Sequence, residues 1–401
     1  MQTSARYQAI LELLDEVFQD KTPADVILNR YLRARKYIGS KDRRFITDTL
    51  WDIIRHRMRL TFDAQSTKPR DILLTYLKNE DFDIITGGPH GLEPLTDAEK
   101  HRITHTREDI YPFNVELECP DWLFQKINNP ALISSLNQQA TIDIRANFIS
   151  RDELKNRLQK DGLFFSKTPY SPFGLRSSDR LNLNNCICYH EGLFDLQDEA
   201  CQVAACLCNP HPSDKIIDYC AGAGGKSLAL GALLQNEGLI YCHDIDFRRM
   251  DTIKDRAERL SIKNLKLISH LEDADFDCFI IDSPCSGSGT WRRAPDAKFR
   301  LTPERLEELT KIQFDILQTA YQHTKSGGRI IYMTCSVLND ENENIVQKFA
   351  SLHPDIRFAD HRQLWQQKID TPYPFTTSDY LNFSPLLTST DGFFFCMLHK
   401  H

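Results

Sequence analysis

From residue 215 onward, short apolar runs alternate with segments whose apolar residues recur at helical spacing. Strands that alternate with helices form a parallel sheet, because each crossover between parallel strands carries a helix. The predicted strands and helices are, in order, 215–219, 226–234, 239–245, 248–260, 265–268, 276–282, 302–323 and 329–335. An apolar run at 393–398 would complete the sheet. The pattern predicts a doubly wound α/β fold.

Two other patterns precede this region, as expected for 401 residues, which exceed what one hydrophobic core usually supports. The first hundred or so residues carry apolar side chains at helical spacing throughout. Short strand-like runs then flank a helix around 151–158, which indicates a small α+β module. We therefore predict a helical domain at 1–115, a small α+β (RRM-like) module at 116–200 and the large α/β domain at 201–401.

The composition is that of an average soluble protein, with 41% hydrophobic and 26% charged residues. No apolar run is long enough for a membrane span, and the N-terminus lacks the layout of a signal peptide. The 12 cysteines are dispersed, unlike the disulfide frameworks of small secreted proteins. We expect a cytoplasmic monomer with reduced thiols and no membrane partner.

Cys285 and Cys335 each end an apolar run and begin a turn of small residues. Because ligands bind at the carboxyl ends of parallel strands, both thiols are expected at the functional edge of the sheet. Cysteine is also a common buried residue that behaves as a small hydrophobe. We apply that interpretation to Cys201, Cys206, Cys242, Cys278 and Cys396.

A glycine-rich turn follows the first predicted strand and opens a helix, which lets the backbone approach a ligand closely. Its glycine spacing fits neither a dinucleotide site nor a phosphate-binding loop. Asp244 ends the second strand, where an acid accepts hydrogen bonds from ribose hydroxyls. A nucleoside cofactor without a phosphate loop suggests S-adenosylmethionine. The turn residues are Cys220, Ala221, Gly222, Ala223, Gly224, Gly225 and Lys226.

Basic residues form two local clusters, although the net charge of -7 disfavours nucleic-acid binding by the chain as a whole. The first cluster lies within 30–59, and the second follows the Cys285 turn. A solvated charged face is the alternative interpretation of each. Candidate RNA-binding residues are Arg33, Arg35, Lys36, Lys41, Arg43, Arg44, Arg292 and Arg293.

Two closely spaced cysteine pairs, Cys186-x-Cys188 and Cys206-x-Cys208, raise the question of a zinc site. A structural zinc site usually has Cys-x2-4-Cys pairs with further His or Cys ligands at set distances. The spacing here differs, so we expect no metal.

Several stretches together resemble the Nop/Sun (RsmB-like) family of RNA cytosine-5 methyltransferases. The resemblance implies a Rossmann-like S-adenosylmethionine-dependent methyltransferase sheet. It also implies an RNA substrate, with ribosomal RNA favoured over transfer RNA. The matching stretches are 194–200, 218–226, 244–249, 282–289 with 292–296, 327–343 and 391–394.

The resemblance also implies roles for individual residues. Carbon 5 of cytosine is a poor nucleophile, so a thiolate must first add to carbon 6. Cys335 holds the family's nucleophile position, and Cys285 that of the cysteine which assists release. Asp282 would hydrogen-bond the cytosine ring or the cofactor's amino group, and Lys226 would lie near the base.

Two departures from the family concern the cofactor side. Its turn usually reads Ala-Ala-Pro-Gly-Gly-Lys, whereas Gly222 and Ala223 stand here in place of the second Ala and the Pro. The acid that often touches adenine is not evident in 268–273. A non-catalytic RNA-binding or ribosome-assembly factor therefore stays open, as does a transfer RNA enzyme. A DNA cytosine methyltransferase would not need Cys335.

Overall fold

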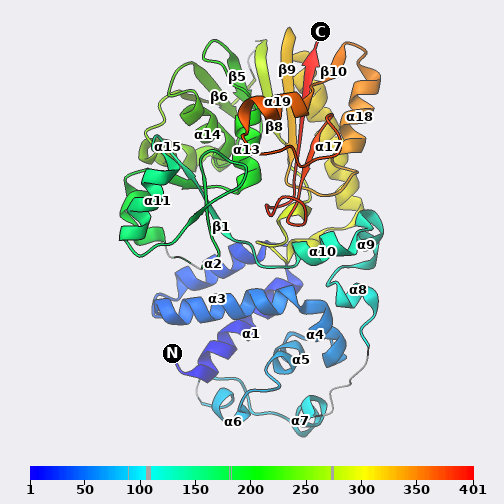
Figure 1. The fold of residues 1–401 in the computed structure, drawn as a ribbon. Coiled ribbons are helices and arrows are strands. Elements are labelled where there is room, and N and C mark those ends of the chain that lie inside the picture. Colours follow the sequence, from blue (N-terminus) through cyan, green and yellow to red (C-terminus); the bar gives the residue numbers. More distant parts are fainter. Residues whose placement is uncertain (89, 105–109, 180, 182, 272–274) are drawn as a thin grey trace. The chain divides into compact units, whose positions relative to one another are not determined.

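The computed structural model describes residues 1–88, 90–104, 110–179, 181, 183–271 and 275–401, and these form two compact units (Figure 1). The first unit comprises Met1–Gln138 with Trp291–Thr302, and the second comprises Gln139–Thr290 with Pro303–His401. No helix among the described residues is long and apolar enough to cross a membrane.

The first unit is helical, as the apolar spacing predicts. Its core gathers the apolar stripes of the first helices, including Ile10, Leu14, Ile27 and Leu50. The helices are α1 (Thr3–Gln19), α2 (Ala24–Ala34), α3 (Ser40–Arg55), α4 (Arg57–Ala64), α5 (Pro69–Tyr76), α6 (Phe82–Ile85), α7 (Asp97–Thr104), α8 (Phe113–Glu116), α9 (Asp121–Ile127), α10 (Pro130–Leu136) and α16 (Ala297–Arg300).

Helix α16 belongs to a segment that leaves the α/β sequence and packs into the helical unit. The Arg55 guanidinium donates to the carbonyl of Arg292 at 3.0 Å, and the Asp296 carboxylate accepts from the backbone of Ala24 at 3.1 Å. The buried Lys298 ammonium donates to Asn137 at 2.7 Å. Burial lowers the pKa of Lys298 to about 8.

The large sheet of the second unit confirms the predicted doubly wound fold. Its strand order is β10-β12-β9-β8-β5-β6-β7, parallel from β7 to β9 and antiparallel at β12 and β10, and β11 pairs with β12. The strands are β5 (Lys215–Asp218), β6 (Leu239–His243), β7 (Leu265–Ile268), β8 (Phe276–Asp282), β9 (Thr324–Thr334), β10 (Ile356–Phe358), β11 (Leu381–Phe383) and β12 (Phe393–Lys400).

Helices cover both faces of this sheet, so its strands are apolar on both sides. One core joins the sheet to α13, α14, α15 and α19, and the other joins it to α17 and α18. The helical elements are α13 (Glu199–Leu207), α14 (Gly225–Leu233), η2 (Phe247–Met250), α15 (Asp251–Arg259), η3 (Ser288–Thr290), α17 (Pro303–Gln322), α18 (Glu343–Leu352) and α19 (His361–Lys368).

The strand predicted at 329–335 begins earlier than expected, because β9 starts at Thr324 and includes Gly327 and Gly328, which the sequence suggests as a turn. Gly327 has φ +80°, and the pairing with β8 shifts register between Phe276 and Cys278. Two glycines in a row are typical of a turn, but here they lie near the irregular beginning of a strand.

A small antiparallel sheet of order β2-β3-β1-β4 precedes the large one. It packs on α11 and α12 through a core that includes Ile144, Leu158 and Phe194. Residues 116–138, assigned to this module from the sequence, lie in the helical unit instead. The elements are β1 (Ile142–Ala146), α11 (Arg151–Lys160), β2 (Ser166–Lys167), β3 (Gly174–Ser177), η1 (Leu183–Asn185), α12 (Ile187–His190) and β4 (Phe194–Leu196).

Candidate active site

A cleft of about 950 Å³ opens at the carboxyl ends of the parallel strands. Its wall includes the glycine turn after β5, the residues after β6, the turn after β8 and one face of α17. Cys285, Cys335, Asp282 and Asp244 all line it, so the structure brings the main predicted site residues into one cavity.

The glycine turn between β5 and α14 has a backbone that few other residues could adopt. Gly222 and Gly224 have φ of +51° and +81°, in the left-handed region that favours glycine. A Cβ at Gly224 would also lie 2.8 Å from the Ile253 side chain. A Cβ at Gly225 would meet nothing within 4 Å, and Gly225 lines the cleft. This part of the turn therefore leaves room for a ligand against the backbone.

Two side chains outside the motif hold this turn. Gln197 donates its amide to the carbonyl of Gly225 at 3.1 Å, and the Arg256 guanidinium donates to the carbonyl of Ala223. Arg256 is itself bound to Asp195 of β4 at 2.5 Å. The small sheet thus braces the turn at Gly225 and, through Arg256, at Ala223, which departs from the family.

Asp244 lies at the floor of the cleft with 3% of its surface exposed. Its carboxylate accepts the backbone N–H of Gly222 at 3.0 Å and pairs with Arg249 at 3.1 Å. Ile245 beside it is 97% exposed and also lines the cleft. A buried acceptor next to an open apolar surface fits the ribose and base of a nucleoside. Glu272 and Asp273, in the stretch searched for an adenine contact, lie outside the described residues.

Replacing Asp244 should weaken cofactor binding. We expect Asp244→Ala to raise the Kd for S-adenosylmethionine roughly 100-fold, because two hydrogen bonds to a charged acceptor are lost. Isothermal titration calorimetry measures this directly. The matched control is Asp246→Ala, which removes a helix-capping carboxylate two residues away. Equal affinities of Asp244→Ala and the wild type would contradict the assignment.

Lys226 and Asp282 form a partly buried ion pair at the cleft wall, with Nζ 2.6 Å from Oδ2. Burial by itself would lower the pKa of Lys226, but the Asp282 carboxylate together with the Cys201 and Cys335 sulfurs outweighs burial, so the pKa is raised. Lys226 therefore remains charged and orients Asp282, which is the member of the pair that lines the cleft.

The two candidate thiols are neighbours. Cys285 Sγ lies 3.3 Å from Cys335 Sγ, because β8 and β9 are adjacent parallel strands and each cysteine follows the carboxyl end of its strand. The hydrogen bond to Cys335, together with burial, raises the pKa of Cys285 well above the usual value for a thiol. Cys285 is therefore protonated at neutral pH, which allows it to be the donor in its hydrogen bond with Cys335, although either sulfur can take that part.

Glu341 joins the two cysteine turns and was not singled out as a site residue from the sequence. It is fully buried and accepts the backbone N–H of Ser286 at 2.8 Å and the amide of Gln313 at 2.9 Å. Its other oxygen accepts the hydroxyls of Ser286 and Ser336, each at 2.5 Å. Ser286 follows Cys285 and Ser336 follows Cys335, so one carboxylate fixes the separation of the thiols.

We expect Glu341→Gln to lower kcat about 10- to 100-fold, because the amide keeps only one accepting oxygen, so either the two N–H groups or the two serine hydroxyls lose their acceptor and the thiols lose their alignment. The Kd for S-adenosylmethionine should stay unchanged, since Glu341 lies on the cysteine side. The matched control is Glu343→Gln two residues further on, at the start of α18, where the carboxylate accepts from Asn382 instead. A wild-type kcat in Glu341→Gln would refute the positioning role.

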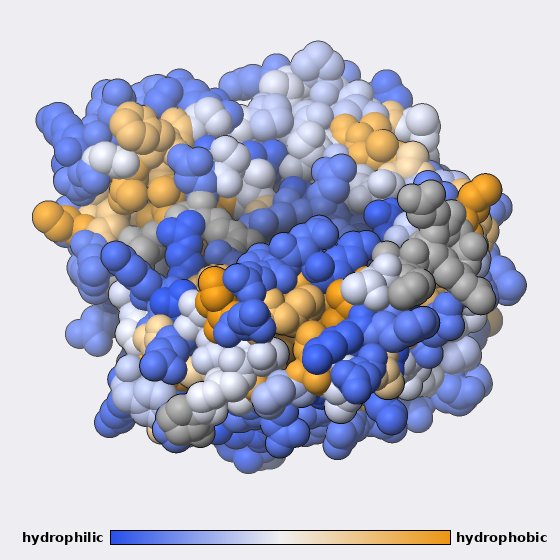
Figure 2. Space-filling model, turned by 90° about the horizontal axis from the view of Figure 1, so that it is seen from below, coloured by the Kyte–Doolittle hydropathy of each residue, from blue (hydrophilic) through white to orange (hydrophobic). Residues whose placement is uncertain are grey.

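The candidate RNA-binding residues all lie in the helical unit. Arg292 is only 8% exposed, and Arg43 donates to the carbonyls of Ile38 and Leu32 within its own unit. Arg35 stacks on Tyr31 with 3.6 Å between the guanidinium carbon and the ring centroid. Figure 2 shows a mostly hydrophilic face of the molecule with scattered hydrophobic groups. The exposed candidates are Arg33, Lys36, Lys41, Arg44 and Arg293.

Residues 205–399 match the family model described as 16S rRNA methyltransferase RsmB/F. A relative from Synechocystis sp. strain PCC 6803, a probable ribosomal RNA small subunit methyltransferase B, is 26% identical over 99% of both chains. The alignment covers the helical unit as well as the α/β unit.

Two solved structures share the fold. PH0851 has a TM-score of 0.79 and 22% identity over 99% of both chains. NSun6 from Pyrococcus horikoshii, solved with the S-adenosylmethionine analogue SFG, has a TM-score of 0.62 and 20% identity over 70% of this chain and 98% of its own.

Proposed function

Because the chain belongs to the RsmB/F family of methyltransferases, we propose that it methylates carbon 5 of a cytosine in ribosomal RNA through a covalent cysteine adduct. The cofactor is S-adenosylmethionine, which supplies an electrophilic methyl group when bound. The observation that carries the proposal is the pair of thiols 3.3 Å apart at the edge of the cleft. A transferase acting on a nucleophilic atom would need no such pair.

The cofactor site is assigned to the glycine turn and Asp244. Backbone groups of 220–225 would contact the amino-acid part of the cofactor, and Asp244 would accept its ribose hydroxyls. The open Cβ position at Gly225 and the exposed Ile245 beside Asp244 support this fit.

The thiolate of Cys335 would add to carbon 6 of the cytosine, and electron density would move to carbon 5, which would take the methyl group as the bond between that group and the sulfonium sulfur breaks to leave a thioether. Asp282, oriented by Lys226, would accept a hydrogen bond from the cytosine amino group and so hold the ring in position for attack by Cys335. The proton on carbon 5 then leaves to a base, its electron pair forms the carbon 5–carbon 6 double bond, and the bond to sulfur breaks. The Cys285 thiol donates a hydrogen bond to the departing Cys335 thiolate.

The target cytosine would have to leave its base stack to enter the cleft. The exposed basic residues of the helical unit would contribute phosphate contacts, which carry affinity and no base specificity.

Methyl transfer to defined RNAs tests the proposal. The protein is incubated with S-adenosylmethionine and with unmethylated 16S ribosomal RNA or transfer RNA, and the nucleosides are then analysed by mass spectrometry. We expect 5-methylcytidine in the ribosomal RNA. Bisulfite sequencing of the same RNA identifies the nucleotide. Methylation only at a ring nitrogen or a ribose oxygen would refute the proposed chemistry. Methylation of transfer RNA alone would show that ribosomal RNA is not the substrate.

A further inference from the structure

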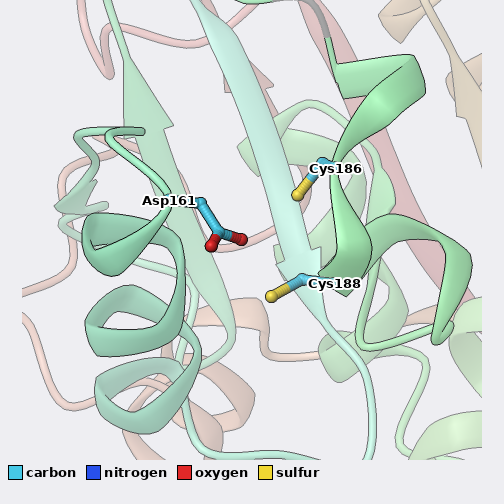
Figure 3. A group of neighbouring side chains, drawn as sticks. All are labelled: Asp161, Cys186 and Cys188. Atoms are coloured by element: carbon cyan, nitrogen blue, oxygen red, sulfur yellow. The ribbon is translucent and has the colours of Figure 1, made fainter.

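Asp161, Cys186 and Cys188 bring one carboxylate and two thiols together in the small sheet region (Figure 3). Their donor atoms all lie within 4.8 Å of one another. Figure 3 shows Asp161, just after α11, facing the two cysteines across a short gap. The Cys-x-Cys spacing alone does not match a structural zinc motif, but the fold supplies a third donor from a different element.

All three groups are anionic when deprotonated, and their donor atoms lie close enough together to contact one ion. Asp161 also caps the carboxyl end of α11, where the helix dipole disfavours a carboxylate and favours a cation. A divalent cation between the three donors would neutralise their negative charges and would lie favourably at the carboxyl end of α11.

We propose that Asp161, Cys186 and Cys188 bind one zinc-type divalent cation, with a water molecule completing a tetrahedral shell. Two thiolates select a soft or borderline metal such as Zn²⁺ over Mg²⁺ or Ca²⁺. Binding would release one proton from each thiol to solvent. The cysteines are 5% and 3% exposed whereas Asp161 is exposed, which leaves an entry path and a place for the water on the aspartate side.

The site would be structural and would strengthen the part of the chain that braces the glycine turn. It would tie the end of α11 to the start of α12, which leads directly into β4. The two outer strands of the small sheet are short, with β2 at Ser166–Lys167 and β4 at Phe194–Leu196. A small core with short strands gains stability from a metal cross-link. Asp195 of β4 holds Arg256, which binds the turn at Ala223.

Cobalt substitution tests the proposal with a signal that does not depend on activity. The full chain is stripped with a chelator under reducing conditions and titrated with Co²⁺, which gives a thiolate-to-metal charge-transfer band only when cysteine sulfur is a ligand. We expect one equivalent to produce the band, and Zn²⁺ to displace it. Zn²⁺ should also raise the melting temperature of the wild type.

The chain offers matched controls. Cys188→Ser should abolish the band, and Asp161→Asn, at an exposed position that leaves folding intact, should weaken binding at least about 10-fold. Cys206→Ser removes a buried cysteine with the same Cys-x-Cys spacing on α13 and should keep the band.

Three outcomes would overturn the proposal. They are a wild type without a band, a band of unchanged affinity in Asp161→Asn, and a band that survives in Cys188→Ser but disappears in Cys285→Ser. The last result would place the metal on the paired thiols of the cleft and mark it as adventitious.

Discussion

Cys335→Ala should abolish methyl transfer, with a fall in kcat of about 10⁴-fold or more, as expected when a nucleophile is removed. Without addition of a thiolate to carbon 6, carbon 5 of cytosine is too weak a nucleophile to attack the methyl group. The substitution removes one partly buried sulfur whose neighbour Cys285 is 3.3 Å away, so the fold should survive. Labelled methyl transfer to 16S ribosomal RNA, with calorimetric S-adenosylmethionine binding on the same sample, separates catalysis from cofactor affinity.

Cys396→Ala is the control for the loss of a cysteine from the neighbouring strand. Cys396 lies on β12, opposite Tyr332 of β9, and is buried in the core between the sheet and helices α17 and α18. Its loss should lower stability by about 1 kcal/mol and leave methyl transfer in place. Transfer by Cys335→Ala at more than about a tenth of the wild-type rate would assign the nucleophile elsewhere, with Cys285 as the first thiol to test.

The parallel sheet could be predicted because its signal is local. Each strand is an apolar run bounded by turn residues, and the predicted 276–282 strand coincides with β8. The positions of Cys285 and Cys335 followed from the same rule, since the ends of neighbouring parallel strands meet at one edge. Their separation did not, because strand order is a property of the whole sheet.

Local sequence patterns missed the residues that contact segments far away in the chain. Glu341 contacts Ser286 on a turn 55 positions away in the chain, and Gln197 reaches Gly225 from the small sheet. The segment Trp291–Thr302 was assigned to the α/β domain by its place in the sequence, yet it packs in the helical unit. The sequence of a short segment does not show which unit the segment packs against. Arg292 was therefore expected to be an exposed basic residue, although it is buried.

Cys285→Ala should convert the enzyme into one that stays attached to its RNA. Addition by Cys335 and methylation of carbon 5 need no proton from Cys285, whereas the departing Cys335 sulfur loses its hydrogen-bond donor. We expect turnover to fall about 10²- to 10⁴-fold, the range of a lost acid or base, while a denaturation-resistant complex accumulates to a large fraction of the protein. The measurement is a denaturing gel with labelled RNA, with and without S-adenosylmethionine.

The adduct should form only when RNA and S-adenosylmethionine are both present, and its bond to the protein should be at the Cys335 sulfur. Nuclease digestion followed by mass spectrometry should locate a methylated cytosine on Cys335, and the Cys285→Ala Cys335→Ala double variant should form no complex. Cys285→Ser tests the hydrogen bond itself, because a hydroxyl can donate to the sulfur of Cys335 where a methyl group cannot, so its complex should release RNA faster than that of Cys285→Ala. If Cys285→Ala releases methylated RNA at the wild-type rate, the 3.3 Å pair has no role in resolving the adduct. The thiol proton held between the two sulfurs would then belong to an earlier step, the generation of the Cys335 thiolate.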